Sequence, residues 1–130
     1  MKRLFSKANL FYLATGLIFT HELDGMINSE WRVLPLTSWL PEEIGRTAYV
    51  WLHVPLFGIV IALISSSNLT TRKRSRFWVS AFLVIHGLLH AGFMVHPHYE
   101  FSSLQSNLLI FGAAVCGLIF LIMDKRDRSV

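Results

Sequence analysis

Four long apolar runs constrain the fold of this 130-residue chain more than any other feature. They cover roughly residues 8–27, 44–64, 77–95 and 106–123, with short charged segments between them. Each run is close to the ~20 residues that a helix needs to cross a hydrocarbon core about 30 Å thick. Only 15% of the residues are charged, against about 25% in an ordinary soluble domain. The pattern predicts one all-α domain over residues 1–130, a bundle of four transmembrane helices.

The positive charges predict how these helices are oriented. Ten of the twelve Lys and Arg residues flank the runs at one end of the bundle: Lys2, Arg3, Lys7, Arg72, Lys73, Arg74, Arg76, Lys125, Arg126 and Arg128. Because such residues concentrate in cytoplasmic segments, both termini are expected in the cytoplasm, with the protein multi-pass in the plasma membrane. No basic groove with interleaved aromatic residues accompanies the net charge of +4, so we expect membrane lipids and no nucleic acid as partners.

All six histidines fall in the half of the bundle away from these cations: His21, His53, His86, His90, His96 and His98. Ionisable side chains at membrane depth are costly and usually functional. Imidazole is also the commonest metal ligand in proteins. The one-sided distribution therefore predicts a functional site in the outer leaflet.

Helix geometry places four of the histidines in one layer. At 1.5 Å per residue, His21, His53 and His90 lie about 17–20 Å from the cytoplasmic ends of their helices, and His86 about 14 Å. His86 and His90 are four residues apart, so they project from one helix face. Three or four such groups can hold an ion with bonds of about 2.0–2.2 Å. These four histidines are therefore predicted metal ligands, with zinc or iron as the expected ion.

Two carboxylates near the end of the first predicted helix accompany the histidines. Asp24 lies three residues after His21 on the same helix face, and we predict that it is a further metal ligand or orients an imidazole. Glu22 points in another direction and is the predicted general base of a metal-dependent reaction. For His96, His98 and Glu100, at the rim, solvation and ligation fit the sequence equally well.

The segment 28–43 between the first two runs is predicted to be a loop at the outer membrane surface. Trp31 and Trp39 support this position, since tryptophan is enriched at membrane interfaces. Glu30 is most simply a solvated charge of this loop, or a partner of Arg32 or Arg46.

Several short motifs resemble those of a family of small, functionally uncharacterised bacterial four-pass membrane proteins. They are Thr-His-Glu-Leu-Asp at 20–24, Glu-Trp-Arg at 30–32, the His-x-x-x-His pair at 86–90 and His-Pro-x-Tyr-Glu at 96–100. The resemblance covers most of the chain and implies the fold, the topology and a place in the bacterial inner membrane, but no activity. The histidines are also loosely similar to those of membrane hydroxylases, desaturases and zinc-dependent amidases. The hydroxylases and desaturases, however, carry more histidines, in repeated boxes that face the cytoplasm.

These observations favour an integral membrane protein with a His/carboxylate metal site. If the protein is an enzyme, a metal-dependent reaction on a lipid or other apolar substrate is expected. One alternative is a haem-binding electron carrier with axial histidines from two helices. Another is an ion or proton transport protein, or an accessory subunit, that uses the same residues. At 130 residues, a transport role would require a homo-oligomer.

Overall fold

The computed structural model describes residues 6–128, and all the regular structure within them is helical. The helices are α1 (Lys7–Ile27), the short 3₁₀ helix η1 (Glu30–Arg32), α2 (Glu42–Ile64), α3 (Leu69–Phe93) and α4 (Leu104–Arg128). The all-α fold expected from the sequence is thus confirmed for this part of the chain.

Three of the helices, α2, α3 and α4, are long and apolar enough to cross a membrane. α1 has 21 residues, but its last two turns carry His21, Glu22 and Asp24 and lower its apolar character. The crossing of the membrane by α1 therefore stays a prediction.

The start of α3 differs from the start of the apolar run. The helix begins at Leu69, so residues 69–76, which precede that run, form its first two turns. Asn68 caps this helix, because its side chain accepts a hydrogen bond from the backbone N–H of Thr71 at 3.0 Å. Arginine and lysine are good helix formers, so a basic segment behind such a cap extends the helix beyond the apolar residues.

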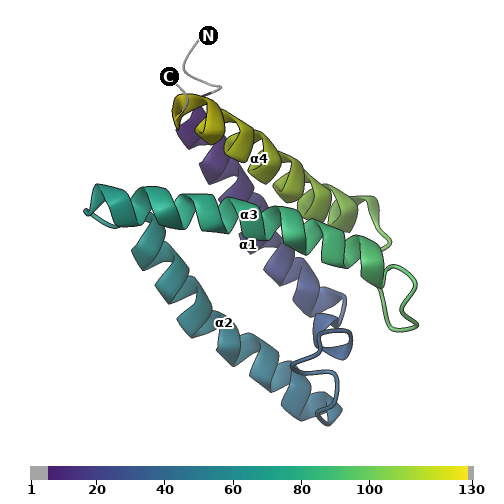
Figure 1. The fold of residues 1–130 in the computed structure, drawn as a ribbon. Coiled ribbons are helices and arrows are strands. Elements are labelled where there is room, and N and C mark those ends of the chain that lie inside the picture. Colours follow the sequence, from purple (N-terminus) through teal and green to yellow (C-terminus); the bar gives the residue numbers. More distant parts are fainter. Residues whose placement is uncertain (1–5, 129–130) are drawn as a thin grey trace.

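α4 is the central packing partner in the bundle, since it lies against both α1 and α3. α2 meets α3 near the turn that joins them and then diverges from it (Figure 1). Small residues allow α3 and α4 to approach closely. A Cβ atom added at Gly87 would lie 2.7 Å from the Cβ of Ala114, and one at Gly117 would lie 2.8 Å from the carbonyl oxygen of Ser80.

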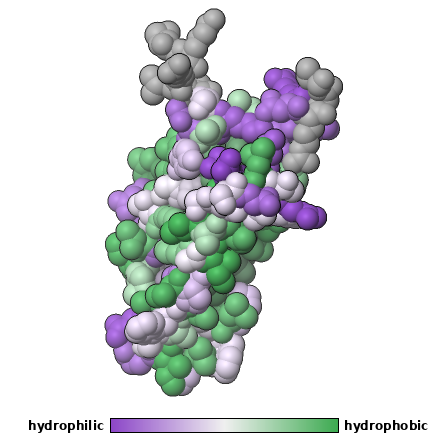
Figure 2. All heavy atoms as spheres, turned by 90° about the vertical axis from the view of Figure 1, so that its left-hand side faces the viewer, coloured by the Kyte–Doolittle hydropathy of each residue, from purple (hydrophilic) through white to green (hydrophobic). Residues whose placement is uncertain are grey.

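The outer surface of the helices is largely apolar. Large exposed side chains include Trp51, Leu56, Phe82 and Leu88 on α2 and α3. Figure 2 shows hydrophobic side chains over much of the middle and lower part of one face, with hydrophilic ones gathered mainly toward its upper end and a smaller group at its lower left. This distribution suits a molecule whose middle is surrounded by hydrocarbon.

The start of α1 and the end of α4 are joined by ion pairs. Lys7 Nζ lies 2.7 Å from Asp124 Oδ1 and 2.6 Å from Asp127 Oδ2. Nearby, Arg76 of α3 donates to the Tyr12 hydroxyl at 2.9 Å. The loops 28–41 and 94–103 lie at the opposite end of the bundle (Figure 1).

Candidate metal centre

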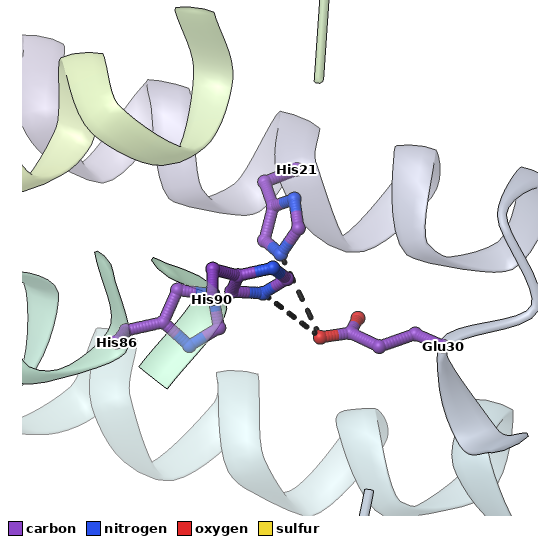
Figure 3. Close-up of side chains that lie close together, drawn as sticks. All are labelled: His21, Glu30, His86 and His90. Atoms are coloured by element: carbon purple, nitrogen blue, oxygen red, sulfur yellow. Dashed lines mark ion pairs between the residues drawn. The ribbon is translucent and has the colours of Figure 1, made fainter. Parts of the chain in front are cut away.

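Three histidines and one glutamate from three different elements converge near the end with these two loops (Figure 3). His21 comes from the last turns of α1, His86 and His90 from α3, and Glu30 from η1. Each offers one ligand atom, and these atoms all lie within 4.8 Å of one another. We call this set the histidine–glutamate group.

Two of the separations within the histidine–glutamate group are close to those around a metal ion. Glu30 Oε1 lies 3.3 Å from His90 Nε2 and 3.7 Å from His21 Nε2. In a tetrahedral site with bonds of about 2.0–2.1 Å, neighbouring ligand atoms are about 3.3–3.4 Å apart. The wider separations in the group, which lie within 4.8 Å, would have to contract to complete such a site.

Burial of these polar side chains costs free energy unless a ligand binds to them. His21, Glu30 and His90 expose between 0% and 3% of their surface. Both ring nitrogens of His21 and the Nε2 atom of His86 are buried without a hydrogen-bond partner among the described residues. Buried polar atoms in native proteins are nearly always satisfied. A cation held by these nitrogens would remove that cost, so the residues present fit a metal ion.

The Glu30 carboxylate is charged in this environment. Burial by itself raises the pKa of Glu30, but its contacts with His21 and His90 and its hydrogen bond with Tyr49 outweigh burial. Together they hold the pKa well below its ordinary value. The side chain is therefore in the ionised form that ligates metals.

Two tyrosines hold members of the histidine–glutamate group in place. The Tyr49 hydroxyl donates to Glu30 Oε2 at 2.6 Å, and the Tyr99 hydroxyl lies 3.3 Å from His90 Nδ1. Both contacts leave the atoms that face the other ligands available, namely Glu30 Oε1 and His90 Nε2. Partners of this kind orient ligands in metalloproteins.

Gly25 makes room for one of these contacts. A Cβ atom at this position would overlap the Tyr49 hydroxyl and the Glu30 carboxylate. The absence of a side chain on α1 therefore lets α2 and η1 bring these two groups together.

Loop residues cover the group on its outer side. Phe101 is 0% exposed, and its ring centroid lies 5.3 Å from that of His21 and 5.0 Å from that of His90. Arg32 pairs with Glu42 at 2.9 Å and with Glu100 at 3.2 Å. These pairs tie η1 and the start of α2 to the loop that carries Phe101.

The structure brings together three of the predicted ligands, His21, His86 and His90, and adds Glu30 to them. The interpretation of Glu30 as a solvated loop charge, or as a partner of Arg32 or Arg46, is wrong. Glu30 is buried and its carboxylate faces the histidines. The signal in the sequence is its position a few residues beyond a helix end that carries a histidine.

Asp24 and His53 lie outside the histidine–glutamate group. Asp24 Oδ1 accepts a hydrogen bond from Gln105 Nε2 of α4 at 3.1 Å. His53 Nε2 lies 2.8 Å from Glu22 Oε2. The ligand roles of Asp24 and His53 remain predictions.

Glu22, the predicted general base, is connected to the candidate ligand Glu30 through a single group, the hydroxyl of Tyr49. Its Oε2 atom is 3.0 Å from the Tyr49 hydroxyl, which also contacts Glu30. His53 therefore belongs to a polar chain that continues through Glu22 and Tyr49 to Glu30. The catalytic role of Glu22 remains a prediction.

At the rim, Glu100 pairs with Arg32. His98, which is exposed, and His96, which is half-exposed, lie side by side. Their ring centroids are 5.7 Å apart, and the backbone N–H of His98 donates to His96 Nδ1 at 3.2 Å. Neither histidine is part of the histidine–glutamate group.

Comparison with known proteins places the chain beside a protein family without an assigned role. A family model described as "Family of unknown function (DUF6713)" matches residues 7–127. No curated protein and no solved structure matches the chain. The matched segment contains the whole histidine–glutamate group.

Proposed function

The chain belongs to this family of unknown function, DUF6713, and we propose that it is a membrane protein that binds one divalent transition-metal ion. The proposed ligands are His21, Glu30, His86 and His90. The observation that carries the proposal is their convergence, buried and with ligand atoms within 4.8 Å of one another. Ring nitrogens without partners at His21 and His86 support it.

The ligand types restrict the choice of ion. Imidazole nitrogen suits zinc, iron, copper and nickel, whereas a carboxylate oxygen favours harder ions than a thiolate does. A set of three imidazoles and one carboxylate therefore fits zinc or ferrous iron. The rings also favour an ion over haem. His21 lies 5.0 Å from His86 and 4.8 Å from His90 between ring centroids, which leaves no space for a macrocycle between them.

The proposal places the site in the outer leaflet of a bacterial inner membrane. α2, α3 and α4 have the length and apolarity of spanning helices. We propose α1 as a fourth span, because it packs along α4 and buries His21 and Asp24. The concentration of Lys and Arg residues at the opposite end supports cytoplasmic termini.

The polar chain next to the metal ligands supports a catalytic role. A bound metal ion would polarise an oxygen atom of a substrate or lower the pKa of a water molecule. Glu22, which pairs with His53, would then accept a proton near the ion as general base. The apolar surface of α2 and α3 favours a lipid or another apolar molecule as the substrate.

Elemental analysis tests the metal proposal directly. The full chain would be purified without a tag or chelator in mild detergent, and its zinc and iron content measured. We expect near-stoichiometric metal in the native protein and little in Glu30→Gln and His90→Ala. His98→Ala is the matched control, because His98 is exposed and outside the group.

The result that contradicts the proposal is equally specific. Stoichiometric metal in both Glu30→Gln and His90→Ala, with helix content unchanged by circular dichroism, would exclude the histidine–glutamate group as the binding site.

A further inference from the structure

One face at the start of α3 carries cations that are followed by aromatic side chains. A surface hollow of about 430 Å³ is lined by Thr70, Lys73, Arg74, Phe77 and Trp78. Their spacing of three, four, seven and eight residues from the first is that of a single helix face. We call this set the α3 stripe. Its cations lie toward the start of the helix and its aromatic rings toward the middle.

The two cations of the α3 stripe are available to an external anion. Lys73 and Arg74 are exposed. Within residues 6–127, their side chains form no hydrogen bond or ion pair with another side chain or with a carbonyl. Their neighbours differ, because Arg72 donates to the Ser66 carbonyl at 3.0 Å and Arg76 to the Ile64 carbonyl at 3.2 Å. The neighbouring arginines therefore hold the turn together, whereas Lys73 and Arg74 do not.

The spacing along α3 matches the layers of a bilayer. With 25 residues the helix is about 37 Å long, longer than a hydrocarbon core of about 30 Å. Trp78 is 62% exposed, and exposed tryptophan favours the edge of the hydrocarbon. Lys73 and Arg74 precede it by about 6–8 Å of helix rise, which is about the depth of one headgroup layer.

From this match we propose that the α3 stripe binds an anionic phospholipid. Lys73 and Arg74 contact the headgroup phosphate, while Phe77 and Trp78 contact the glycerol and the first acyl methylenes. The ammonium group is a compact charge, and the guanidinium fork matches phosphate oxygens. This inference goes beyond the metal site and depends only on the proposed placement in a membrane.

A second hollow nearby is less suited to an anion. It shares Lys73, but its other cations are already engaged, Arg72 and Arg76 by backbone carbonyls. Its two carboxylates, Asp124 and Asp127, pair with Lys7. The carboxylates of Asp124 and Asp127 neutralise Lys7 and would repel a phosphate. Of these two hollows, the α3 stripe is therefore the one in which positive charge and aromatic surface meet without opposing carboxylates in the lining.

Native mass spectrometry of the full chain, released from nanodiscs of phosphatidylcholine with a minor fraction of phosphatidylglycerol, tests this proposal. We expect retained phosphatidylglycerol to exceed its mole fraction, with a preference of about fivefold per cation. Lys73→Gln/Arg74→Gln should abolish the preference. The matched control is Lys125→Gln/Arg126→Gln, which removes the same charge from α4 at the same end and should keep it.

Three results would overturn the proposal. They are equal retention of the two lipids by the native chain, equal loss of preference in the two double variants, and displacement of phosphatidylglycerol by inorganic phosphate alone. The charge reversal Lys73→Glu/Arg74→Glu provides a second test, because it should make the chain prefer phosphatidylcholine. Metal content measured on the same samples separates this outcome from any failure of the metal proposal.

Discussion

The hydroxyl of Tyr49 holds one oxygen of Glu30 and leaves the other oxygen to the histidines. Tyr49 donates to Oε2 at 2.6 Å, while Oε1 lies 3.3 Å from His90 Nε2. α2 is thereby linked to the histidine–glutamate group, whose members come from α1, η1 and α3. A change at Tyr49 should therefore reach the metal ligands on all three of these elements.

Replacement of Tyr49 by Phe should weaken metal binding without unfolding the protein. Loss of an orienting partner typically costs 10–100-fold in affinity, and we expect a reduction of about that size. A titration against a competing chelator measures it. Tyr12→Phe is the control, since Tyr12 bonds to Arg76 at the other end of the bundle. Equal affinities in both variants and the native protein would show that Tyr49 does not orient Glu30.

Two glycines of α1 should respond in opposite ways to alanine. At Gly25 a Cβ atom overlaps the Tyr49 hydroxyl and the Glu30 carboxylate, whereas at Gly16 it meets nothing within 4 Å. Gly25→Ala should therefore lose metal. Gly16→Ala should keep it and gain up to about 1 kcal/mol in free energy of unfolding, because alanine is the better helix former. Metal content and thermal unfolding in detergent check both, and full metal retention by Gly25→Ala would contradict the packing described.

The contact between α3 and α4 should tolerate no added methyl group at Gly87. The new Cβ atom would lie 2.7 Å from that of Ala114, and overpacking of this kind typically costs about 1–3 kcal/mol. Denaturation in mixed micelles measures the loss. Gly92→Ala on the same helix has open space around it and should not be destabilised. Similar stability of the two variants would argue against the close helix approach.

Metal binding should weaken in acid as the imidazoles become protonated. Metal ligation requires neutral imidazole, so protons compete with the ion. The pKa of Glu30 is held below its ordinary value, so its carboxylate stays ionised while the histidines titrate. The affinity should thus fall as the pH is lowered, with Glu30 still ionised while it falls. Equilibrium dialysis at a series of pH values measures this. A metal affinity that does not change with pH would show that imidazoles are not the ligands.

Much of the helical fold and most of the histidine–glutamate group could be predicted from the sequence. The apolar runs indicate where helices lie, and the spacing of His86 and His90 fixes their common face. His21 stands out as a polar residue near the end of an apolar run. These features depend on local periodicity alone.

Glu30 could not be predicted in the same way, because its position depends on the turn that precedes it. Ser29 has a φ of 52°, in the left-handed region that favours glycine. A serine gives no such signal in the sequence, yet this residue lies where the chain passes from α1 into η1. The pairing of Asp24 with Gln105 was equally hidden, since it depends on how α4 packs against α1.

The burial of Phe101 against His21 and His90 has a consequence for kinetics. An ion that approached His21 and His90 from the side of Phe101 would first have to displace the loop 94–103, so this step would limit the rate of loading along that path. A metal ion acquired while the chain folds would then exchange slowly. Occupancy would reflect the conditions of biosynthesis more than those of the surrounding medium.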